Sequence, residues 1–315
     1  MKTVFITGAS GLIGRELTKV LLSRGYNVIG TDSKQSEFVG QPNYSFVQCA
    51  ITDKAKISSI LEGSKIDALI HLACSVDNDY NNVMEPQYEK DADACDKYIY
   101  KTAALAGITD ILLLSTHLVY APQKTREPIR ETNPDKPITD YAKMKAESEK
   151  YLAAVVKKNP SCHGVVMRVC PIYTKDYIVN LHAKIYDVKD ECAFMYGSGD
   201  YGFSFCCLYN LIDFIWGLLE VAPGTNYQGV YNICDSKPIY AREIVEYMRA
   251  NFKLGPVIQR NYGADAVKSA IAFGNKRLKT DYRYVDISTI CNNVTFDNTK
   301  AQRISRFRWK LSNSL

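Results

Sequence analysis

The sequence lacks any long run of apolar residues. No stretch reaches the ~18 apolar residues in a row that a membrane-spanning helix needs, so we expect no association with a membrane. The first apolar run, residues 4–6, follows the N-terminus almost directly. This leaves no room for a signal peptide, and the sequence therefore predicts a cytoplasmic protein.

Cysteine spacings typical of metal sites are also missing. The chain has ten cysteines, of which Cys206 and Cys207 are adjacent and the others are scattered through apolar stretches. This distribution disfavours a zinc site and a disulfide framework, and it predicts buried thiols in a reducing compartment, with no metal. The net charge of +5 is mild, and no basic block occurs before the C-terminal third. We therefore expect no nucleic-acid partner.

Length and composition indicate a globular protein of ordinary make-up. The chain has 315 residues, of which 46% are hydrophobic and 23% are charged. Such a chain suits one large domain or two closely packed ones, because a single core stops growing at about 250–300 residues.

One stretch near the N-terminus, residues 3–14, combines an apolar run with three regularly spaced glycines. Residues 4–6 suit a buried parallel strand, and Gly8, Gly11 and Gly14 follow at a G-x-x-G-x-x-G spacing. Leucines at helical intervals come next, and a second apolar run ends at Asp32. A strand, a glycine turn, a helix, a strand and an acid in this order predict dinucleotide binding, with the phosphates at the helix N-terminus.

The pattern of strand and helix continues well beyond this unit. Strands are expected near 44–47, 68–73 and 111–114, and helices near 57–61, near 92–106 and from Tyr141 onward. We expect an α/β fold, a Rossmann-type doubly wound parallel sheet over residues 1–171 that carries the cofactor. Residues 172–315 are richer in aromatics and more irregular, with helices near 209–220 and 241–252. They predict a smaller substrate-binding region, partly interleaved with the first.

Polar residues that could carry chemistry occur on the expected long helix, at one strand end and within one strand. Tyr141 and Lys145 lie four residues apart on the expected long helix, hence on one face. Alone, such a pair is as consistent with a surface tyrosine and lysine; its weight comes from following a dinucleotide unit and Thr116, a hydroxyl at a strand end. His71 lies within an apolar strand, and we expect it to be a hydrogen-bonded structural residue rather than a catalytic one.

Here the chain resembles the extended short-chain dehydrogenases/reductases, the NAD-dependent epimerase/dehydratase family that modifies sugar nucleotides. The resemblance covers nearly the whole chain. The matching motifs are Thr7-Gly8-Ala9-Ser10-Gly11-Leu12-Ile13-Gly14, His71-Leu72-Ala73, Ser115-Thr116 with Val119-Tyr120, and Tyr141-Ala142-Lys143-Met144-Lys145, followed by Met167-Arg168-Val169, Tyr196-Gly197-Ser198-Gly199, Gly229-Val230-Tyr231-Asn232-Ile233 and Phe296-Asp297-Asn298-Thr299-Lys300-Ala301.

The resemblance implies a role for each matching residue. Tyr141 would be the acid/base, Lys145 would hold the nicotinamide ribose and tune Tyr141, and Thr116 would hydrogen-bond the reacting oxygen. An adjacent ammonium and a nicotinamide cation should lower the pKa of the tyrosine from its ordinary value of about 10. The residues expected to bind NAD are Gly8, Ser10, Gly11, Leu12, Ile13, Gly14, Asp32, Ile51, Leu72, Ala73, Cys74, Tyr141, Lys145 and Cys170.

The chain also departs from the family pattern at positions that contact substrate. Pro171 occupies the place of the family's substrate-binding asparagine. The arginine that binds the diphosphate in family members has no equivalent within residues 202–205. The planar guanidinium group that would donate hydrogen bonds to the diphosphate is therefore missing from this stretch. Basic residues further on are either its replacement or an ordinary solvated face: Lys276, Arg277, Lys279 and Arg283. Ala50 stands where an acid would contact adenine, so we expect Ile51 to contact it through backbone and packing.

The sequence therefore predicts an NAD-dependent epimerase or ketoreductase acting at C4 of a nucleotide-activated sugar, in a homodimer. Two alternatives remain open: a dehydrogenase of a small alcohol or ketone without a nucleotide, and a cofactor-bound regulatory protein with little catalysis. The intact set of Thr116, Tyr141 and Lys145 argues against the regulatory alternative. His117 and Leu118 follow Thr116 where dehydrating members carry an Asp-Glu pair, so we expect no 4,6-dehydratase activity.

Overall fold

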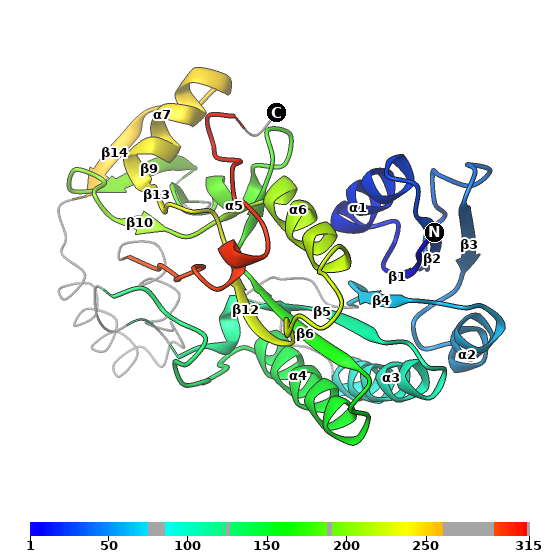
Figure 1. The fold of residues 1–315 in the computed structure, drawn as a ribbon. Coiled ribbons are helices and arrows are strands. Elements are labelled where there is room, and N and C mark those ends of the chain that lie inside the picture. Colours follow the sequence, from blue (N-terminus) through cyan, green and yellow to red (C-terminus); the bar gives the residue numbers. More distant parts are fainter. Residues whose placement is uncertain (75–85, 122, 124–126, 188–190, 261–292, 314–315) are drawn as a thin grey trace.

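The glycine turn and the polar strand ends lie at one edge of a central parallel sheet (Figure 1). The fold comes from a computed structural model that describes residues 1–74, 86–121, 123, 127–187, 191–260 and 293–313, with the side chains of 86–93 left out. The basic residues between 276 and 283 lie outside the described residues.

Seven parallel strands form the main sheet in the order β12-β6-β5-β4-β1-β2-β3. The sheet order changes direction at β1, which pairs with both β2 and β4, and this is the switch point at which ligands bind in such folds. The strands are β1 (Thr3–Thr7), β2 (Asn27–Asp32), β3 (Tyr44–Gln48), β4 (Ala68–His71), β5 (Asp110–Thr116), β6 (His163–Val169) and β12 (Gly229–Ile233).

Helices cover both faces of this sheet, and they pack there because successive strand residues point to opposite sides (Figure 1). Val4 and Ile6 belong to the core under α1 and α6, whereas Phe5 belongs to the core under α2, α3 and α4. The helices are α1 (Leu12–Ser23), α2 (Lys54–Gly63), α3 (Pro86–Leu105), α4 (Asp140–Lys158) and α6 (Leu208–Leu219), with a 3₁₀ turn η1 (His117–Val119) after β5.

The C-terminal half adds a smaller region around a third core. Three small sheets pair β10 with β13, β11 with β7, and the central strand β9 with both β14 and β8. Their elements, with the remaining helices, are β7 (Ile172–Tyr173), α5 (Val179–His182), β8 (Tyr186–Asp187), β9 (Cys192–Tyr196), β10 (Gly202–Phe203), β11 (Cys206–Cys207), β13 (Ile239–Tyr240), α7 (Ala241–Asn251), β14 (Val257–Arg260) and η2 (Ala301–Arg303).

The predicted α/β fold is confirmed: a Rossmann-type parallel sheet with a smaller C-terminal region. Most elements fall where the periodicity places them, but α3 begins at Pro86 instead of near residue 92. A proline is compatible with the first turn of a helix, where its missing N–H is not needed.

Candidate active site

The glycine turn between β1 and α1 leaves no room for side chains. A Cβ atom at Gly14 would lie 2.1 Å from the carbonyl oxygen of Gly8 and 2.7 Å from the Cα of Ala9. Gly8 itself has a φ of +75° and lies against the backbone of Ala73 at the end of β4. The tight turn therefore brings the first turn of α1 close to the strand ends.

The N-terminus of α1 suits an anion. Gly11 is the N-cap residue, and no side chain caps the helix. The next three residues, Leu12, Ile13 and Gly14, border a cleft, and their backbone N–H groups have no partner among the described residues. Three free donors and the positive end of a helix dipole in a cleft fit the diphosphate of a dinucleotide.

Asp32 lies at the end of β2, where its carboxylate is tied to the turn. One oxygen accepts a hydrogen bond from the N–H of Ser10 at 3.0 Å, and the other accepts one from the N–H of Lys34 at 3.0 Å. The side chain remains partly exposed. The predicted cofactor residues Ser10 and Asp32 are thus brought together.

A cleft of about 270 Å³ connects this turn with the ends of β4, β5 and β6. Thr116 at the end of β5 and Tyr141 in the first turn of α4 both border it. No charged side chain belongs to the described lining. The lining residues are Gly8, Gly11, Leu12, Ile13, Gly14, Leu72, Leu114, Ser115, Thr116, His117, Tyr141, Val169, Cys170, Pro171, Ile172, Tyr177 and Asn180.

Tyr141 and Lys145 share one face of α4, as their spacing predicts. The helix begins after Thr139, whose hydroxyl caps it by accepting the N–H of Ala142 at 3.2 Å. Lys145 is only 2% exposed, and its ammonium donates to the carbonyl of Leu114 at 3.0 Å. The Lys145 Nζ lies 6.0 Å from the centre of the Tyr141 ring. The pair is therefore held directly beside the end of β5.

Burial and charge act in opposite directions on this pair. Burial raises the pKa of Tyr141 above its ordinary value, and the nearby Lys145 offsets only part of that increase. Burial lowers the pKa of Lys145, but Cys74, Tyr141 and Asp96 together outweigh it, so the lysine stays charged. Lys145 thus acts on Tyr141 in the expected direction, but the expected net lowering is not reached with the residues of the chain alone.

Asp96 on α3 is a residue of the site that motif reasoning missed. It is 9% exposed and accepts a hydrogen bond from His71 Nε2 at 3.0 Å. Burial raises the pKa of Asp96, yet His71 and Lys145 prevail and hold it below its ordinary value. His71 also contacts the Thr7 hydroxyl through Nδ1 at 2.7 Å, which confirms it as a hydrogen-bonded structural residue. No short sequence signal links Asp96 to Lys145, because they come from different helices.

His117 also lines the cleft. Its Nδ1 lies 3.1 Å from the carbonyl oxygen of Val169, and since a carbonyl only accepts, the ring hydrogen must be on Nδ1. Phe296 packs edge-on against the ring at 5.4 Å. Burial lowers the pKa of His117 to about 4, with a smaller contribution from Lys184, so the ring is neutral. A neutral, anchored histidine agrees with the expectation that it is not a dehydratase acid.

The other predicted cofactor residues lie near the cleft without all bordering it. Leu72 and Cys170 line it, whereas Ala73 and Cys74 continue from the end of β4 toward Lys145. Ile51 packs into the core under α2 and does not line the cleft. Tyr177 and Asn180, from the smaller C-terminal region, also line the cleft.

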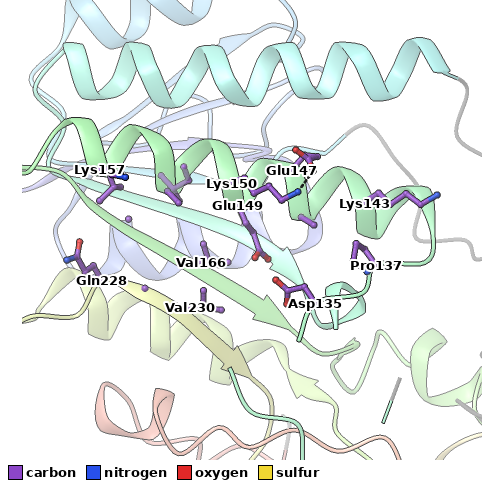
Figure 2. Close-up of a pocket in the computed structure, with 16 residues that line it drawn as sticks. Asp135, Pro137, Lys143, Glu147, Glu149, Lys150, Lys157, Val166, Gln228 and Val230 are labelled. Carbon is purple, nitrogen blue, oxygen red and sulfur yellow. Dashed lines mark hydrogen bonds and ion pairs between the residues drawn. The ribbon is translucent and has the colours of Figure 1, made fainter. Parts of the chain in front are cut away.

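A larger cavity of about 730 Å³ lies beside α4, between this helix and the strands β6 and β12 (Figure 2). Val166 on β6 and Val230 on β12 form part of its floor, and Glu147, Lys150 and Lys157 project from the helix beside it. It includes neither the glycine turn nor Thr116 and Tyr141. The smaller cleft is therefore the candidate active site.

The fold and the cleft define a Rossmann-type protein that presents a threonine, a tyrosine and a buried lysine beside a glycine turn. Residues 4–234 match the NAD dependent epimerase/dehydratase family. The chain belongs to this family, as its motifs predicted. The structure contains no helix, within the residues it describes, that is long and apolar enough to cross a membrane.

Three known proteins illustrate the likeness. Protein CapI of Staphylococcus aureus is 22% identical over 290 residues, which are 82% of this chain and 85% of that protein. The sterol-4-alpha-carboxylate 3-dehydrogenase (decarboxylating) of Dictyostelium discoideum is 25% identical over 193 residues, 58% of each chain. The UDP-glucuronic acid 4-epimerase of Bacillus cereus, solved with UDP-glucuronic acid and NAD, has a TM-score of 0.73 at 17% identity, covering 99% of this chain and 96% of that one. The last likeness shows the fold alone.

Proposed function

We propose that the protein is an NAD-dependent epimerase or ketoreductase that acts at C4 of a nucleotide-activated sugar. The observation that carries this proposal is the cleft in which Thr116 and Tyr141 meet the free N–H groups of α1, with Lys145 fixed beside them. NAD would supply the hydride acceptor and donor when bound. The comparison structure, which holds a UDP-sugar and NAD, supports the choice of substrate class.

Each residue of the site has a separate role, which follows from its position. Tyr141 removes the proton from the C4 hydroxyl and returns it, and Thr116 hydrogen-bonds the same oxygen. Lys145 keeps its positive charge because Cys74, Tyr141 and Asp96 together outweigh the effect of burial, and this charge favours the phenolate form of Tyr141. The positive ring of the bound cofactor would favour that form further, which would offset the effect of burial.

Asp32 supports the choice of NAD rather than NADP as the cofactor. A carboxylate at the end of β2 accepts hydrogen bonds from ribose hydroxyls and repels a 2′-phosphate. Asp32→Asn should raise the relative affinity for NADP, and it should also weaken NAD binding because the carboxylate holds the N–H of Ser10. Calorimetric titration of both cofactors checks this. Equal affinity of the native protein for NAD and NADP would contradict the assignment.

Incubation with UDP-, dTDP-, GDP- and CDP-hexoses in the presence of NAD tests the reaction. We expect inversion at C4 of one of them, or oxidation of its C4 hydroxyl to a ketone with formation of NADH, which is the reverse of ketoreduction. Nuclear magnetic resonance of the product and the absorbance of NADH distinguish the two. We expect no 4-keto-6-deoxy product, because Leu118 cannot transfer a proton and His117 is anchored on Val169. Appearance of that product at enzymatic rates would refute the proposal.

A second candidate is a dehydrogenase of a substrate without a nucleotide. It is favoured by the described lining of the cleft, in which no arginine or lysine is available for a diphosphate. The sterol dehydrogenase among the relatives is consistent with it. Thermal shifts measured with nucleotide sugars and with small alcohols or ketones separate the two candidate functions. A ligand that is present at about 100 times its Kd stabilises the native state by about 2.7 kcal/mol.

We further propose a cytoplasmic homodimer assembled through α3 and α4. The support on the α4 side is the cavity between this helix and the strands β6 and β12, whose floor is apolar and whose rim carries charges of both signs (Figure 2). Static light scattering of the purified protein tests the assembly, and a monomer at all concentrations would contradict it.

A further inference from the structure

Helix α4 carries a third functional side chain on the face that bears Tyr141 and Lys145. Glu149 follows Lys145 by four residues, so the three lie along one stripe of the helix. Tyr141 borders the cleft, Lys145 reaches the carbonyl of Leu114 on β5, and Glu149 is 9% exposed beneath them. The stripe therefore runs from the cleft into the core.

Two neighbouring strands meet Glu149 at the same level. Ser115 on β5 and Arg168 on β6 are register partners, so their side chains leave the sheet on the same side. The Ser115 hydroxyl donates to the Glu149 carboxylate. The Arg168 guanidinium donates to the same carboxylate, through Nη2 at 2.6 Å and through Nε at 3.1 and 3.2 Å. Glu149 thus links α4 to the residue that precedes Thr116.

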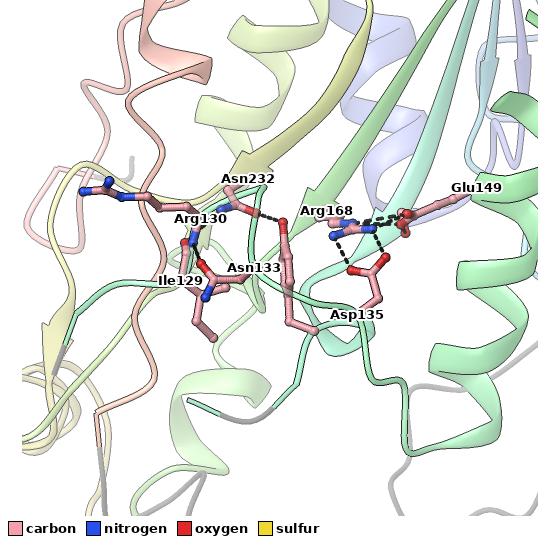
Figure 3. A network of polar contacts seen from close by, with 9 residues as sticks. Ile129, Arg130, Asn133, Asp135, Glu149, Arg168 and Asn232 are labelled. Carbon is pink, nitrogen blue, oxygen red and sulfur yellow. Dashed lines mark hydrogen bonds and ion pairs between the residues drawn. The ribbon is translucent and has the colours of Figure 1, made fainter. Parts of the chain in front are cut away.

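Arg168 is itself fixed on its other side (Figure 3). Its two terminal nitrogens donate to Asp135 at 2.8 and 2.9 Å, a bidentate pair with the segment that leads into α4. The Tyr120 ring lies 4.4 Å from the guanidinium carbon. Arg168 is 4% exposed, whereas the Asp135 side chain is 48% exposed. The guanidinium group of Arg168 is therefore held between the carboxylates of Glu149 and Asp135.

Stability alone does not account for this cluster. Burying an ion pair costs desolvation, and replacing such a pair by apolar groups of similar volume is often neutral or stabilising. The cluster instead fixes the distance between α4, which carries Tyr141, and the end of β5, which carries Thr116. Among the described residues, only two side chains of the α4 stripe form hydrogen bonds to β5, those of Lys145 and Glu149.

We propose that Glu149, oriented by Arg168 and Asp135, is a positioning residue that sets the separation between the Thr116 and Tyr141 hydroxyls. The inference rests on the proposed function, because these hydroxyls act on the same substrate oxygen. Glu149 does not touch the substrate. It acts through Ser115, whose position on β5 determines where the next residue, Thr116, meets the cleft.

The test removes the ion pair without leaving a buried charge. The double variant Glu149→Met and Arg168→Met keeps chain length, and Asp135 can turn to solvent. We expect its kcat to fall roughly ten- to a hundredfold, since small displacements of reacting groups have effects of this size. KM, NAD affinity and the midpoint of urea unfolding should stay unchanged. The matched control is Asp53→Asn with Lys56→Met, an ion pair at the start of α2, away from the cleft and from α4. Asparagine can still cap that helix, and the kcat of this control should equal that of the native protein.

A second pair of variants covers the case in which the double variant fails to fold. Ser115→Ala breaks only the tie to Glu149 and should lower kcat in the same way, whereas Ser115→Thr keeps the hydroxyl and should restore it. A double variant with native kcat, or a loss of kcat that follows a loss of stability and NAD affinity, would overturn the positioning role.

Amide hydrogen exchange separates this proposal from the proposed function. In the NAD-loaded protein, exchange at Ser115 and Thr116 should speed up in the double variant and not in the control. Unchanged exchange would overturn the positioning role even if no sugar is turned over. Absence of turnover by the native protein, with faster exchange in the double variant, would refute the proposed function and leave the positioning role supported.

Discussion

Tyr141 is the residue whose chemistry depends most on its surroundings. Burial raises the pKa of its hydroxyl while Lys145 lowers it, so neither effect alone prepares the tyrosine for proton transfer at neutral pH. Lys145 in turn is held in its charged form by Cys74, Tyr141 and Asp96, which together raise its pKa against the effect of burial. Tyr141, the proposed proton-transfer group, therefore depends on the charge of Lys145 and on the groups that maintain that charge.

Substitution of Tyr141 tests this dependence directly. Tyr141→Phe keeps the ring and removes the hydroxyl, so turnover should fall by about 10²–10⁴. NAD affinity should be kept, because Lys145 and the α1 N-terminus remain. Steady-state kinetics and calorimetry with NAD check both parts. A Tyr141→Phe protein with native turnover would remove Tyr141 from the mechanism.

The sequence predicts residues of this kind only when their spacing is local. Thr116, Tyr141 and Lys145 were proposed from a strand end and a helical interval, and the structure brings Thr116 and Tyr141 to one cleft with Lys145 beside them. Asp96 carries no such signal, and the four-residue interval from Lys145 to Glu149 does not reveal the partners of Glu149. Their partners lie on other elements, so their roles follow only from the packing of α3, α4 and β6.

At the scale of elements, the turn between β1 and α1 is the part with the least tolerance. Gly14 lies within the helix, yet its Cα faces the carbonyl of Gly8 so closely that no other residue fits. The strand, turn and helix pattern was predictable because each step obeys a local rule. The start of α3 was not, since Pro86 can either precede a helix or begin one.

Gly14→Ala should therefore impair cofactor binding. The added methyl group would lie 2.1 Å from the Gly8 oxygen, and the helix must move away from the turn to accommodate it. We expect the Kd for NAD to rise and the melting temperature to fall. Gly63→Ala is the matched control, because a Cβ at the end of α2 meets nothing within 4 Å. Equal NAD affinity in both variants would contradict the tight-turn argument.

At the scale of the whole molecule, two buried groups give the stability opposite pH dependences. Burial lowers the pKa of His117 to about 4 from 6.5. The unfolded chain therefore binds more protons in this range, and stability contributed by neutral His117 is lost as pH falls from 6.5 to 4. Burial raises the pKa of Asp235 from 3.8 to about 6, so stability gained by its protonation appears as pH falls from 6 to 3.8.

Replacing one group at a time should separate the two effects. His117→Gln should make the protein less sensitive to acid between pH 6.5 and 4 than the native chain is. Asp235→Asn should make it more sensitive, because the compensating protonation is lost. Urea unfolding midpoints across this range measure both. Parallel pH curves for all three proteins would show that neither group titrates differently on folding.

The place of β12 in the sheet has a consequence for synthesis and folding. This strand pairs with β6, and its Asn232 accepts from the Tyr120 hydroxyl at 2.7 Å and donates to the carbonyl of Ile129 at 3.0 Å. A nascent chain that ends near residue 171 would have the glycine turn, Tyr141 and Lys145, but it would leave the edge of β6 unpaired. Unpaired strand edges favour aggregation. The cofactor-binding half should therefore depend on chaperones, or on low concentration, until more than 60 further residues have left the ribosome, a count that follows from the position of β12 at Gly229–Ile233.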